Sequence, residues 1–475
     1  MTATVETGRT GGMSPSGTGA GPKERRRRTT ELVLIVLAVA IAMAAYAMVH
    51  IARDGALPAS LPRYAGGLLL LALVAHVAIR RFAPYADPVI LPAVVLLNGL
   101  GLVLIHRLDL GEADNALADG DSIPSPDAPL QLTWTAVGVA LFVLVLLVIR
   151  DHRLLQRLTF IIGTVGILFL LLPLVPGLGA TVNGSRLWIR VAGLSFQPGE
   201  IAKLALIIFF AGYLVVHRDA LALAGKRFAG LDLPRARDLG PILLAWVASL
   251  GVLVFQRDLG SSLLFFGVFV VLLYVATERA SWLLYGFVLF FGGAYFAYTQ
   301  FGHVQNRVEL WLNPFPADPE QISESLYGLA AGGILGTGLT EGYPERVPFA
   351  STDFIVATLG EELGLTGLMA VLVLYAVIVE RGLRTALLVR DGFGKLLATG
   401  LSVALALQLF VVVGGVTDLI PLTGLTTPFL SYGGSSLIAN WILVALLLRV
   451  SHAARRPAPP VAPAGPEEMT QVVRL

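Results

Sequence analysis

Long apolar runs constrain this chain more than any other feature of its sequence. Hydrophobic residues make up 56% of the 475 residues and charged residues only 14%. The runs recur at a length that crosses ~30 Å of hydrocarbon, where every backbone polar group needs an internal partner. We therefore expect an all-α polytopic membrane protein with about twelve helical spans. The spans are predicted at 32–52, 64–79, 88–105, 131–149, 158–176, 198–216, 239–255, 260–277, 283–301, 353–379, 396–414 and 428–449.

Both ends of the chain differ from its apolar body. Residues 1–30 are rich in Gly, Ser, Thr and Pro and contain the basic run Lys23–Arg28, while residues 453–475 are rich in Pro and Ala. Such compositions are typical of disordered tails, so we expect tails on either side of one membrane domain at 31–452. The apolar run from Leu32 is too long for a cleavable signal peptide.

Several kinds of chemistry are excluded by residue usage. The chain has no cysteine, which rules out thiolate catalysis, iron–sulfur clusters and cysteine-ligated zinc. Its seven histidines have no metal-ligand spacing, and neither a P-loop nor a dinucleotide motif is present. We expect no nucleotide or organic cofactor and no nucleic-acid partner.

Basic residues are concentrated in alternate loops between the expected spans. Because cytoplasmic loops carry an excess of Lys and Arg, this pattern predicts that both termini are cytoplasmic. Basic residues on that side include Arg80, Arg81, Arg150, Arg153, Arg157, Arg218, Lys226, Arg227, Arg235, Arg237, Arg381, Arg384 and Arg390. The same pattern places on the outer side of the membrane an acidic loop with Asp109, Glu112, Asp114, Asp119, Asp121 and Asp127. It also places there the polar segments 183–200, 256–260, 303–352 and 417–428.

The polar stretch within Trp311–Glu362 belongs to a long outer loop, 302–352, between the ninth and tenth spans. Most connections are short, so a loop of this length is more typical of function than of a connector. Asp318 precedes Pro319 in a segment that further prolines stiffen. A rigid loop can hold a carboxylate at a reacting hydroxyl. Asp-Pro is also a common turn element, and the residues alone leave both interpretations open.

Ionisable residues within or beside spans are candidates for a functional site, because they are costly in lipid. Glu200 and Lys203 share one helix face, either in a polar cavity or as an ion pair that snorkels to the interface. Asp258 lies between two spans, where it could also cap the following helix. Arg186 and Arg190 could bind a pyrophosphate or, with the tryptophan between them, anchor to headgroups.

Acidic residues at the start of the tenth span complete the set of candidates. Glu361 and Glu362 lie about two turns into this span, and we expect them to pair with a basic group that the sequence does not identify. Asp353 stands at the helix start, where an acid suits the helix dipole, so we expect a capping role for it.

Four motifs stand in one order along the chain. They are GSRLWIRVAGLSFQPGEIAK (Gly184–Lys203), QRDLGSSLL (Gln256–Leu264), WLNPFPADP through TDFIVATLGEELGLTGL (Trp311–Leu368) and IPLTGLTTPFLSYGGSSL (Ile420–Leu437). This order resembles the shape, elongation, division and sporulation (SEDS) proteins of the RodA/FtsW type, over residues 130 to 452. The two additional N-terminal spans resemble the longer, RodA-like members.

The resemblance implies a peptidoglycan glycosyltransferase of the bacterial cytoplasmic membrane. Such an enzyme polymerises lipid II at the outer face, releases undecaprenyl pyrophosphate and works with a class B penicillin-binding protein. Asp318 matches the family's essential loop aspartate. Arg307, Glu200, Lys203 and Asp258 match positions that line a central polar cavity. A divalent cation, Mg²⁺ or Mn²⁺, could assist the departing pyrophosphate. A lipid II flippase and a scaffold that only recruits a transpeptidase are the alternatives.

The sequence departs from the family pattern at several positions. Asn313 stands where the family usually has Asp, and Arg257 replaces the proline of a common Gln-Pro-Asp. Ser351 replaces the His before Thr-Asp-Phe, and the segment after the Asp-Pro pair is shortened to Glu320–Ser325.

The charge pattern makes a topological prediction. Residues 106–130 and 302–352 should face the outside, and residues 217–238 the cytoplasm. In intact cells, an impermeant thiol reagent should therefore label Asn115→Cys but not Gly225→Cys. The cysteine-free chain gives this experiment no background. The opposite labelling pattern would overturn the orientation.

Overall fold

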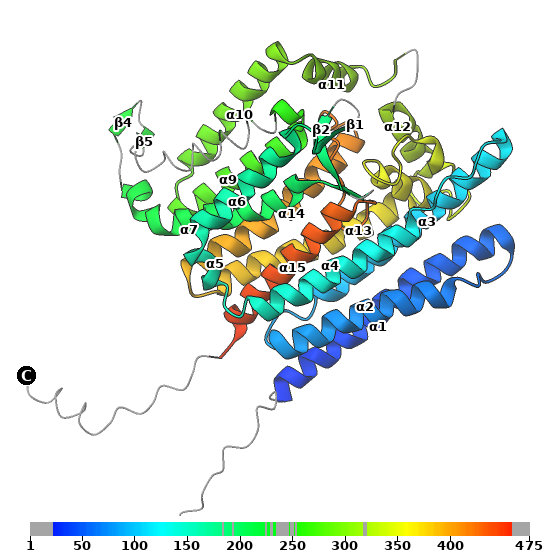
Figure 1. Cartoon of the computed structure of the whole chain (residues 1–475), viewed down its shortest axis with the longest axis horizontal. Coiled ribbons are helices and arrows are strands. Elements are labelled where there is room, and N and C mark those ends of the chain that lie inside the picture. Colours follow the sequence, from blue (N-terminus) through cyan, green and yellow to red (C-terminus); the bar gives the residue numbers. More distant parts are fainter. Residues whose placement is uncertain are drawn as a thin grey trace, which may run out of the picture.

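The computed structural model describes residues 22–182, 185–191, 194–223, 226–228, 231–233, 247, 251, 254–316 and 321–457. Helices dominate this part of the chain (Figure 1). The helices are α1 (Pro22–Asp54), α2 (Leu61–Phe82), α3 (Ile90–Asp119), α4 (Ala128–Val148), α5 (Arg153–Arg157), α6 (Thr159–Leu171), η1 (Leu172–Leu174), α7 (Pro198–Leu223), α9 (Leu259–Thr277), α10 (Ser281–Gln300), α11 (Gly302–Leu312), α12 (Gln321–Gly332), η2 (Pro344–Arg346), α13 (Ile355–Leu388), α14 (Gly392–Val416) and α15 (Gly434–Arg455).

Ten helices of the described ranges are long and apolar enough to cross a membrane. They confirm a polytopic helical membrane protein. The span expected at 158–176 is a shorter apolar helix, Thr159–Leu174, and most of the span expected at 239–255 lies outside the described residues. The count of about twelve therefore stays a prediction. Helix α1 begins at Pro22, within the range 1–30 expected for the N-terminal tail, and the domain bounds stay predictions.

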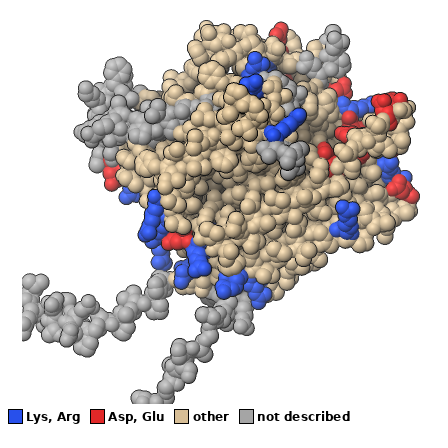
Figure 2. All heavy atoms as spheres, viewed as in Figure 1, with Lys and Arg blue, Asp and Glu red and all other residues tan. Residues whose placement is uncertain are grey.

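The two ends of the bundle differ in composition. Helix α1 begins and α15 ends at the same end, whereas α11, α12 and the strands within 179–196 lie at the opposite end (Figure 1). Lys and Arg dominate the lower edge of the described surface in Figure 2, and Asp and Glu gather mainly at the upper right. The broad band between them is largely uncharged, as expected for a surface in contact with lipid.

The end of the bundle at which α11 and α12 lie also contains a small sheet that the sequence analysis did not predict. Strands β1 (Gly179–Val182), β2 (Ser185–Val191) and β3 (Leu194–Phe196) pair antiparallel in the order β1-β2-β3. A second pair, β4 (Lys226–Phe228) and β5 (Leu231–Leu233), forms a hairpin after α7. The alternation in these strands is too short to stand out between two spans.

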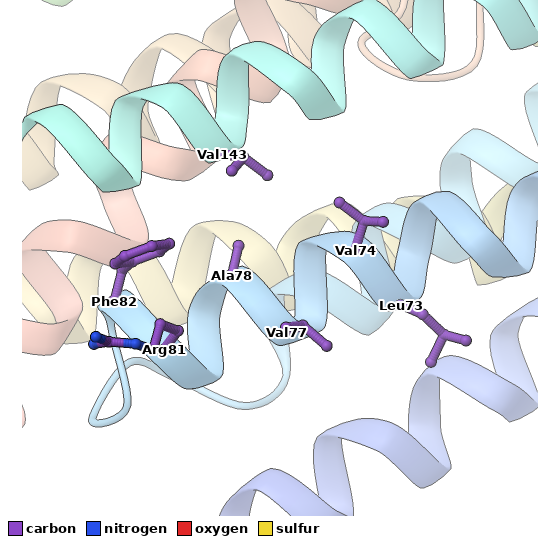
Figure 3. A pocket seen from close by; sticks show the side chains of 7 residues that line it. All are labelled: Leu73, Val74, Val77, Ala78, Arg81, Phe82 and Val143. Carbon is purple, nitrogen blue, oxygen red and sulfur yellow. The ribbon is translucent and has the colours of Figure 1, made fainter.

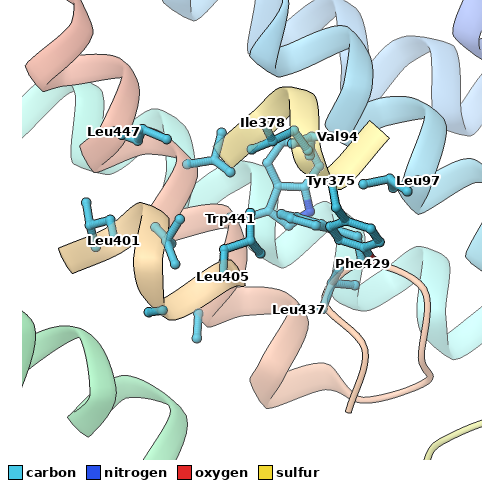
Figure 4. Packing of buried hydrophobic residues seen from close by; sticks show 14 of the residues in the cluster. Val94, Leu97, Tyr375, Ile378, Leu401, Leu405, Phe429, Leu437, Trp441 and Leu447 are labelled. Carbon is cyan, nitrogen blue, oxygen red and sulfur yellow. The ribbon is translucent and has the colours of Figure 1, made fainter. Parts of the chain in front are cut away.

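The hydrophobic core lies where α4, α13, α14 and α15 meet (Figure 4). Trp441 of α15 packs edge-on against Phe142 of α4 at 5.7 Å and against Phe429 at 5.9 Å between ring centroids. Tyr375 of α13 donates its hydroxyl proton to the Pro428 carbonyl. This packing fixes the turn between α14 and α15, which carries much of the polar site.

Glycines allow α12 to pack directly onto a kink in α13. Gly364 has φ 66° and ψ −171°, a conformation that side chains other than hydrogen do not tolerate. Leu365 N donates to the Gly333 carbonyl at 2.9 Å, and Thr337 N donates to the Glu361 carbonyl at 2.9 Å. Backbone hydrogen bonds thereby join the chain after α12 to α13.

The basic partner of the glutamates on α13 is Arg107 of α3. Its Nε lies 2.7 Å from Glu362 Oε1, and its Nη1 lies 3.3 Å from Glu345 Oε2. Arg107 Nη2 also donates to the Gly342 carbonyl at 2.9 Å. Glu361 instead accepts from Tyr343 N at 2.7 Å. These contacts tie α3, α13 and the connection between α12 and α13 together.

Arg107 should be critical for stability because its side chain is only 7% exposed and that of Glu362 is fully buried. Arg107→Met leaves a buried carboxylate without its counter-charge, which should lower the free energy of unfolding by about 3 kcal/mol or more. Arg53→Met is the control, since its pair with Asp114 is exposed and should contribute less than ~1 kcal/mol. Thermal unfolding in detergent compares the two, and equal shifts would contradict this account.

Candidate functional site

Several chain segments that are distant in sequence meet at one end of the bundle. The turn 417–433 lies among them and holds them through hydrogen bonds. Arg307 Nη1 of α11 donates to the Thr423 carbonyl at 3.2 Å, and Trp311 Nε1 donates to the Asp418 carbonyl at 3.0 Å. Just after this turn, Ser435 Oγ accepts from Gln197 N at 2.8 Å. The N-terminal ends of α7 and α15 are therefore joined here, and α11 is fixed to the same turn.

Glu200 and Lys203 form a buried pair on the first turns of α7. Lys203 Nζ lies 2.7 Å from Glu200 Oε2, and their side chains are only 4% and 7% exposed. Lys203 Nζ also donates to Gln408 Oε1 of α14 at 2.9 Å. Gln408 Nε2 in turn donates to the Thr426 carbonyl at 2.8 Å. The pair belongs to an internal polar network, so the snorkelling alternative is wrong.

Asp258 combines the two roles that the sequence left open. Its Oδ1 accepts from Ser261 N at 2.9 Å, which caps the N-terminus of α9. The side chain is buried, and it lies within the electric field of both Glu200 and Arg307. Burial raises the pKa of Asp258, while the hydrogen bonds from Ser261 and the charge of Arg307 oppose that rise. Asp258 therefore both caps α9 and contributes a carboxyl group to the site.

The charge of Arg307 acts on the carboxylates of two residues, Asp258 and Asp353. The second of these, Asp353, precedes α13. A methyl group added at Gly424 would lie 3.5 Å from Asp353 Oδ2 and 4.0 Å from Arg307 Nη2, which locates both beside the turn. Burial raises the pKa of Asp353 to about 6, although Arg307 lowers it. The cap of α13 is Phe354 and no side chain bonds there, so the expected capping role of Asp353 is wrong.

Arg186 and Arg190 lie outside this buried network. Both are on β2 with exposed side chains, and Arg186 Nε donates to Thr181 Oγ1 at 3.3 Å. Alternation along a strand places them and Trp188 on one face. Strand β2, which carries both arginines, lies at the same end of the bundle as α11 and α12 (Figure 1).

Asp318, the predicted catalytic residue, lies outside the described residues, as does the whole segment 317–320. The chain on either side of this segment is held in place. Ser323 Oγ donates to the Pro314 carbonyl at 2.7 Å, which joins the two flanks, and Ser325 Oγ donates to the Val416 carbonyl at 3.3 Å. Both flanks therefore lie beside the turn that binds Arg307.

Sequence reasoning missed one member of the network and gave another the wrong role. Gln408 was missed, although it is a lone amide in the apolar run of α14. A polar side chain inside a span is itself an indication of a functional site. Asp353 was identified but given the wrong role, because acids at helix starts most often serve the helix dipole. Within the described ranges, no group of three or more His, Asp or Glu could hold a metal ion.

The backbone conformation at Arg257 bears on one of the departures from the family pattern, the replacement of the usual proline. Its φ is 63°, in the left-handed region. Proline has its φ locked near −65°, so the proline usual at this family position would not fit the backbone seen here. The turn before Asp258 therefore has a conformation that depends on a residue other than proline.

Comparison with known proteins places the chain in a family. The FTSW_RODA_SPOVE family model, described as cell cycle protein, matches residues 88–456. The chain is 54% identical over 418 residues to a protein named peptidoglycan glycosyltransferase RodA from Mycobacterium tuberculosis, covering 87% of this chain and 88% of the relative. It is 34% identical over 371 residues to a probable peptidoglycan glycosyltransferase FtsW from Geobacter metallireducens, covering 77% of this chain and 94% of the relative.

Solved structures agree with these relatives. A structure described as showing the coordination of polymerization and crosslinking by a peptidoglycan synthase complex matches with a TM-score of 0.62 and 27% identity. It covers 78% of this chain and 99% of that chain. The rod shape determining protein RodA of Thermus thermophilus matches with a TM-score of 0.53 and 25% identity, covering 78% of this chain and 98% of that chain.

The fold and the polar end of the bundle define a multi-pass membrane protein with charged groups gathered at helix ends. The chain belongs to the FtsW/RodA/SpoVE family of cell cycle proteins, the SEDS proteins that its motifs resemble.

The buried network predicts unequal effects for two lysines. Lys203→Ala leaves Glu200 as an uncompensated buried charge, so folded yield or activity should fall severely. Lys395→Ala is the control, because Lys395 is exposed and lies 4.0 Å from Glu278. Fluorescence-detected size exclusion measures folded yield for both variants. Similar, mild losses would mean that the pair at Glu200 does not sit in a dry cavity.

Proposed function

We propose that this protein is a peptidoglycan glycosyltransferase that polymerises lipid II and releases undecaprenyl pyrophosphate. The observation that carries the proposal is a buried set of charged groups at helix ends, in a chain 54% identical to curated peptidoglycan glycosyltransferases. A lipid-linked donor reaches such a site laterally from the bilayer, while its sugars need a polar cleft. The flippase and scaffold alternatives give no reason for a proline-rich aspartate segment whose flanks lie beside these charges.

The orientation follows from charge. We place the polar end outside and both termini in the cytoplasm of a bacterial cell membrane, because basic residues dominate the opposite end. In this orientation the site faces the compartment in which glycan strands are assembled.

Asp318 is proposed as the general base. A sugar hydroxyl is a poor nucleophile, and a carboxylate that takes its proton lowers the barrier as the hydroxyl oxygen bonds to the anomeric carbon. The bond from that carbon to pyrophosphate breaks in the same step. Support comes from the flanks of segment 317–320, which are hydrogen-bonded to each other and to Val416, beside the turn that contacts Arg307.

The cations of the site divide into two groups. Glu200 already neutralises Lys203, and the charges of Asp258 and Asp353 act on Arg307, so these cations suit positioning within the site. Arg186 and Arg190 are exposed and free to approach phosphate oxygens, which arginine binds bidentately. We assign the leaving pyrophosphate to these two arginines.

A divalent cation fits the site only as a companion of the substrate. The carboxylates of Glu200 and Asp258 are engaged by Lys203 and Ser261 respectively, and the charge of Arg307 acts on Asp353. Mg²⁺ commonly binds through one or two carboxylates together with substrate phosphates. When bound, such an ion would neutralise the pyrophosphate charge.

The partner is proposed to be a class B penicillin-binding protein. A solved relative is described as part of a complex that coordinates polymerization with crosslinking, and crosslinking is the reaction of a transpeptidase. The acceptor strand would then pass from one active site to the other.

The central prediction concerns Asp318→Asn. The amide keeps the shape of the side chain but cannot accept a proton at neutral pH, so lipid II polymerisation should slow at least ~100-fold. Expression, melting temperature and partner binding should remain those of the wild type.

Asp119→Asn is the matched control, an exposed acid in the outer acidic loop that should leave the rate unchanged. Polymerisation of fluorescent lipid II, resolved on gels, measures each variant. An Asp318→Asn protein that polymerises at the wild-type rate would refute the assignment, and Asp353 would become the next candidate base.

A further inference from the structure

A groove that faces lipid lies between α2 and α4, away from the polar site (Figure 3). Its volume is about 460 Å³, and its walls include Leu73, Val77 and Phe82 of α2 and Val143 of α4. Val77 is 60% exposed, so the groove opens on the surface that contacts the membrane. Helix α2 precedes the family match, which begins at residue 88, so one wall belongs to the additional N-terminal hairpin.

The groove ends at a cation. Arg81, the single charged residue among those that line it, is exposed and lies with its guanidinium carbon 5.6 Å from the centre of the Phe82 ring. It makes no ion pair with another described residue. At the same end of the bundle Arg28 pairs with Glu31, and Arg455 pairs with Asp87. Among the described residues, no acidic side chain thus neutralises the charge of Arg81.

We propose that this groove binds an anionic phospholipid from the leaflet on the basic side of the membrane. One acyl chain lies along the apolar walls, and the phosphate pairs with Arg81. An apolar slot alone would accept any lipid chain, so the cation at its end sets the preference for a negative headgroup. The lipid would fill the space between α2 and α4 and thereby fasten the N-terminal hairpin to the rest of the bundle.

Native mass spectrometry of the full-length protein tests the site. The probes are dioleoylphosphatidylglycerol and dioleoylphosphatidylcholine at equal concentrations. We expect phosphatidylglycerol to be retained about fivefold better, the preference that one surface cation provides. Arg81→Gln should remove that preference, whereas Arg80→Gln, the neighbouring exposed arginine outside the groove, should keep it.

A second variant separates groove binding from surface attraction. Val143→Trp fills the groove and should reduce retention of both lipids, with an unchanged melting temperature as the check on folding. Equal retention of the two lipids by the wild type would overturn the proposal. So would equal losses for Arg81→Gln and Arg80→Gln, or a lipid-free dimer with the groove covered by a second copy.

Discussion

Charge pairing inside an apolar bundle is the constraint on which the rest of this structure depends. An ion moved out of water loses several kcal/mol unless a partner and further hydrogen bonds replace its hydration. Lys203 satisfies this demand with Glu200 and Gln408, and Arg107 satisfies it with Glu362, Glu345 and a carbonyl. Each network joins helices that are distant in sequence, so pairing decides which helices are neighbours at the polar end.

The turn 417–433 carries this arrangement from packing to function. Irregular backbone at membrane depth is tolerated where it is buried in protein, and here its carbonyls accept from Arg307, Trp311 and Gln408. Below it, the rings of Phe429 and Trp441 fill the core. The turn is therefore held by hydrophobic packing on one side and supplies acceptors to the site on the other.

Sequence reasoning succeeded where the pattern is local. Apolar length predicted most spans, and the spacing of Glu200 and Lys203 predicted a shared face that the structure confirms as a contact. It could not name Arg107 as the partner of Glu362, because helical periodicity says which face is polar but not which distant helix meets it. Asp353 was assigned to a cap because Arg307, whose charge acts on it, lies far back in the sequence on α11. The short strands at 179–196 were missed because flanking spans dominate any hydropathy signal.

The most direct test of the account is polymerisation by the purified wild-type protein. Fluorescent lipid II in detergent or proteoliposomes, with a penicillin-blocked class B transpeptidase as partner, should yield a ladder of long glycan strands that lysozyme degrades. The penicillin prevents crosslinking, so the strands stay separate on the gel. A transpeptidase forms peptide bonds and no glycosidic bonds, so the strands would come from this chain. Movement of lipid II between leaflets without strand formation, under conditions in which a related enzyme polymerises, would contradict the assignment as a glycosyltransferase.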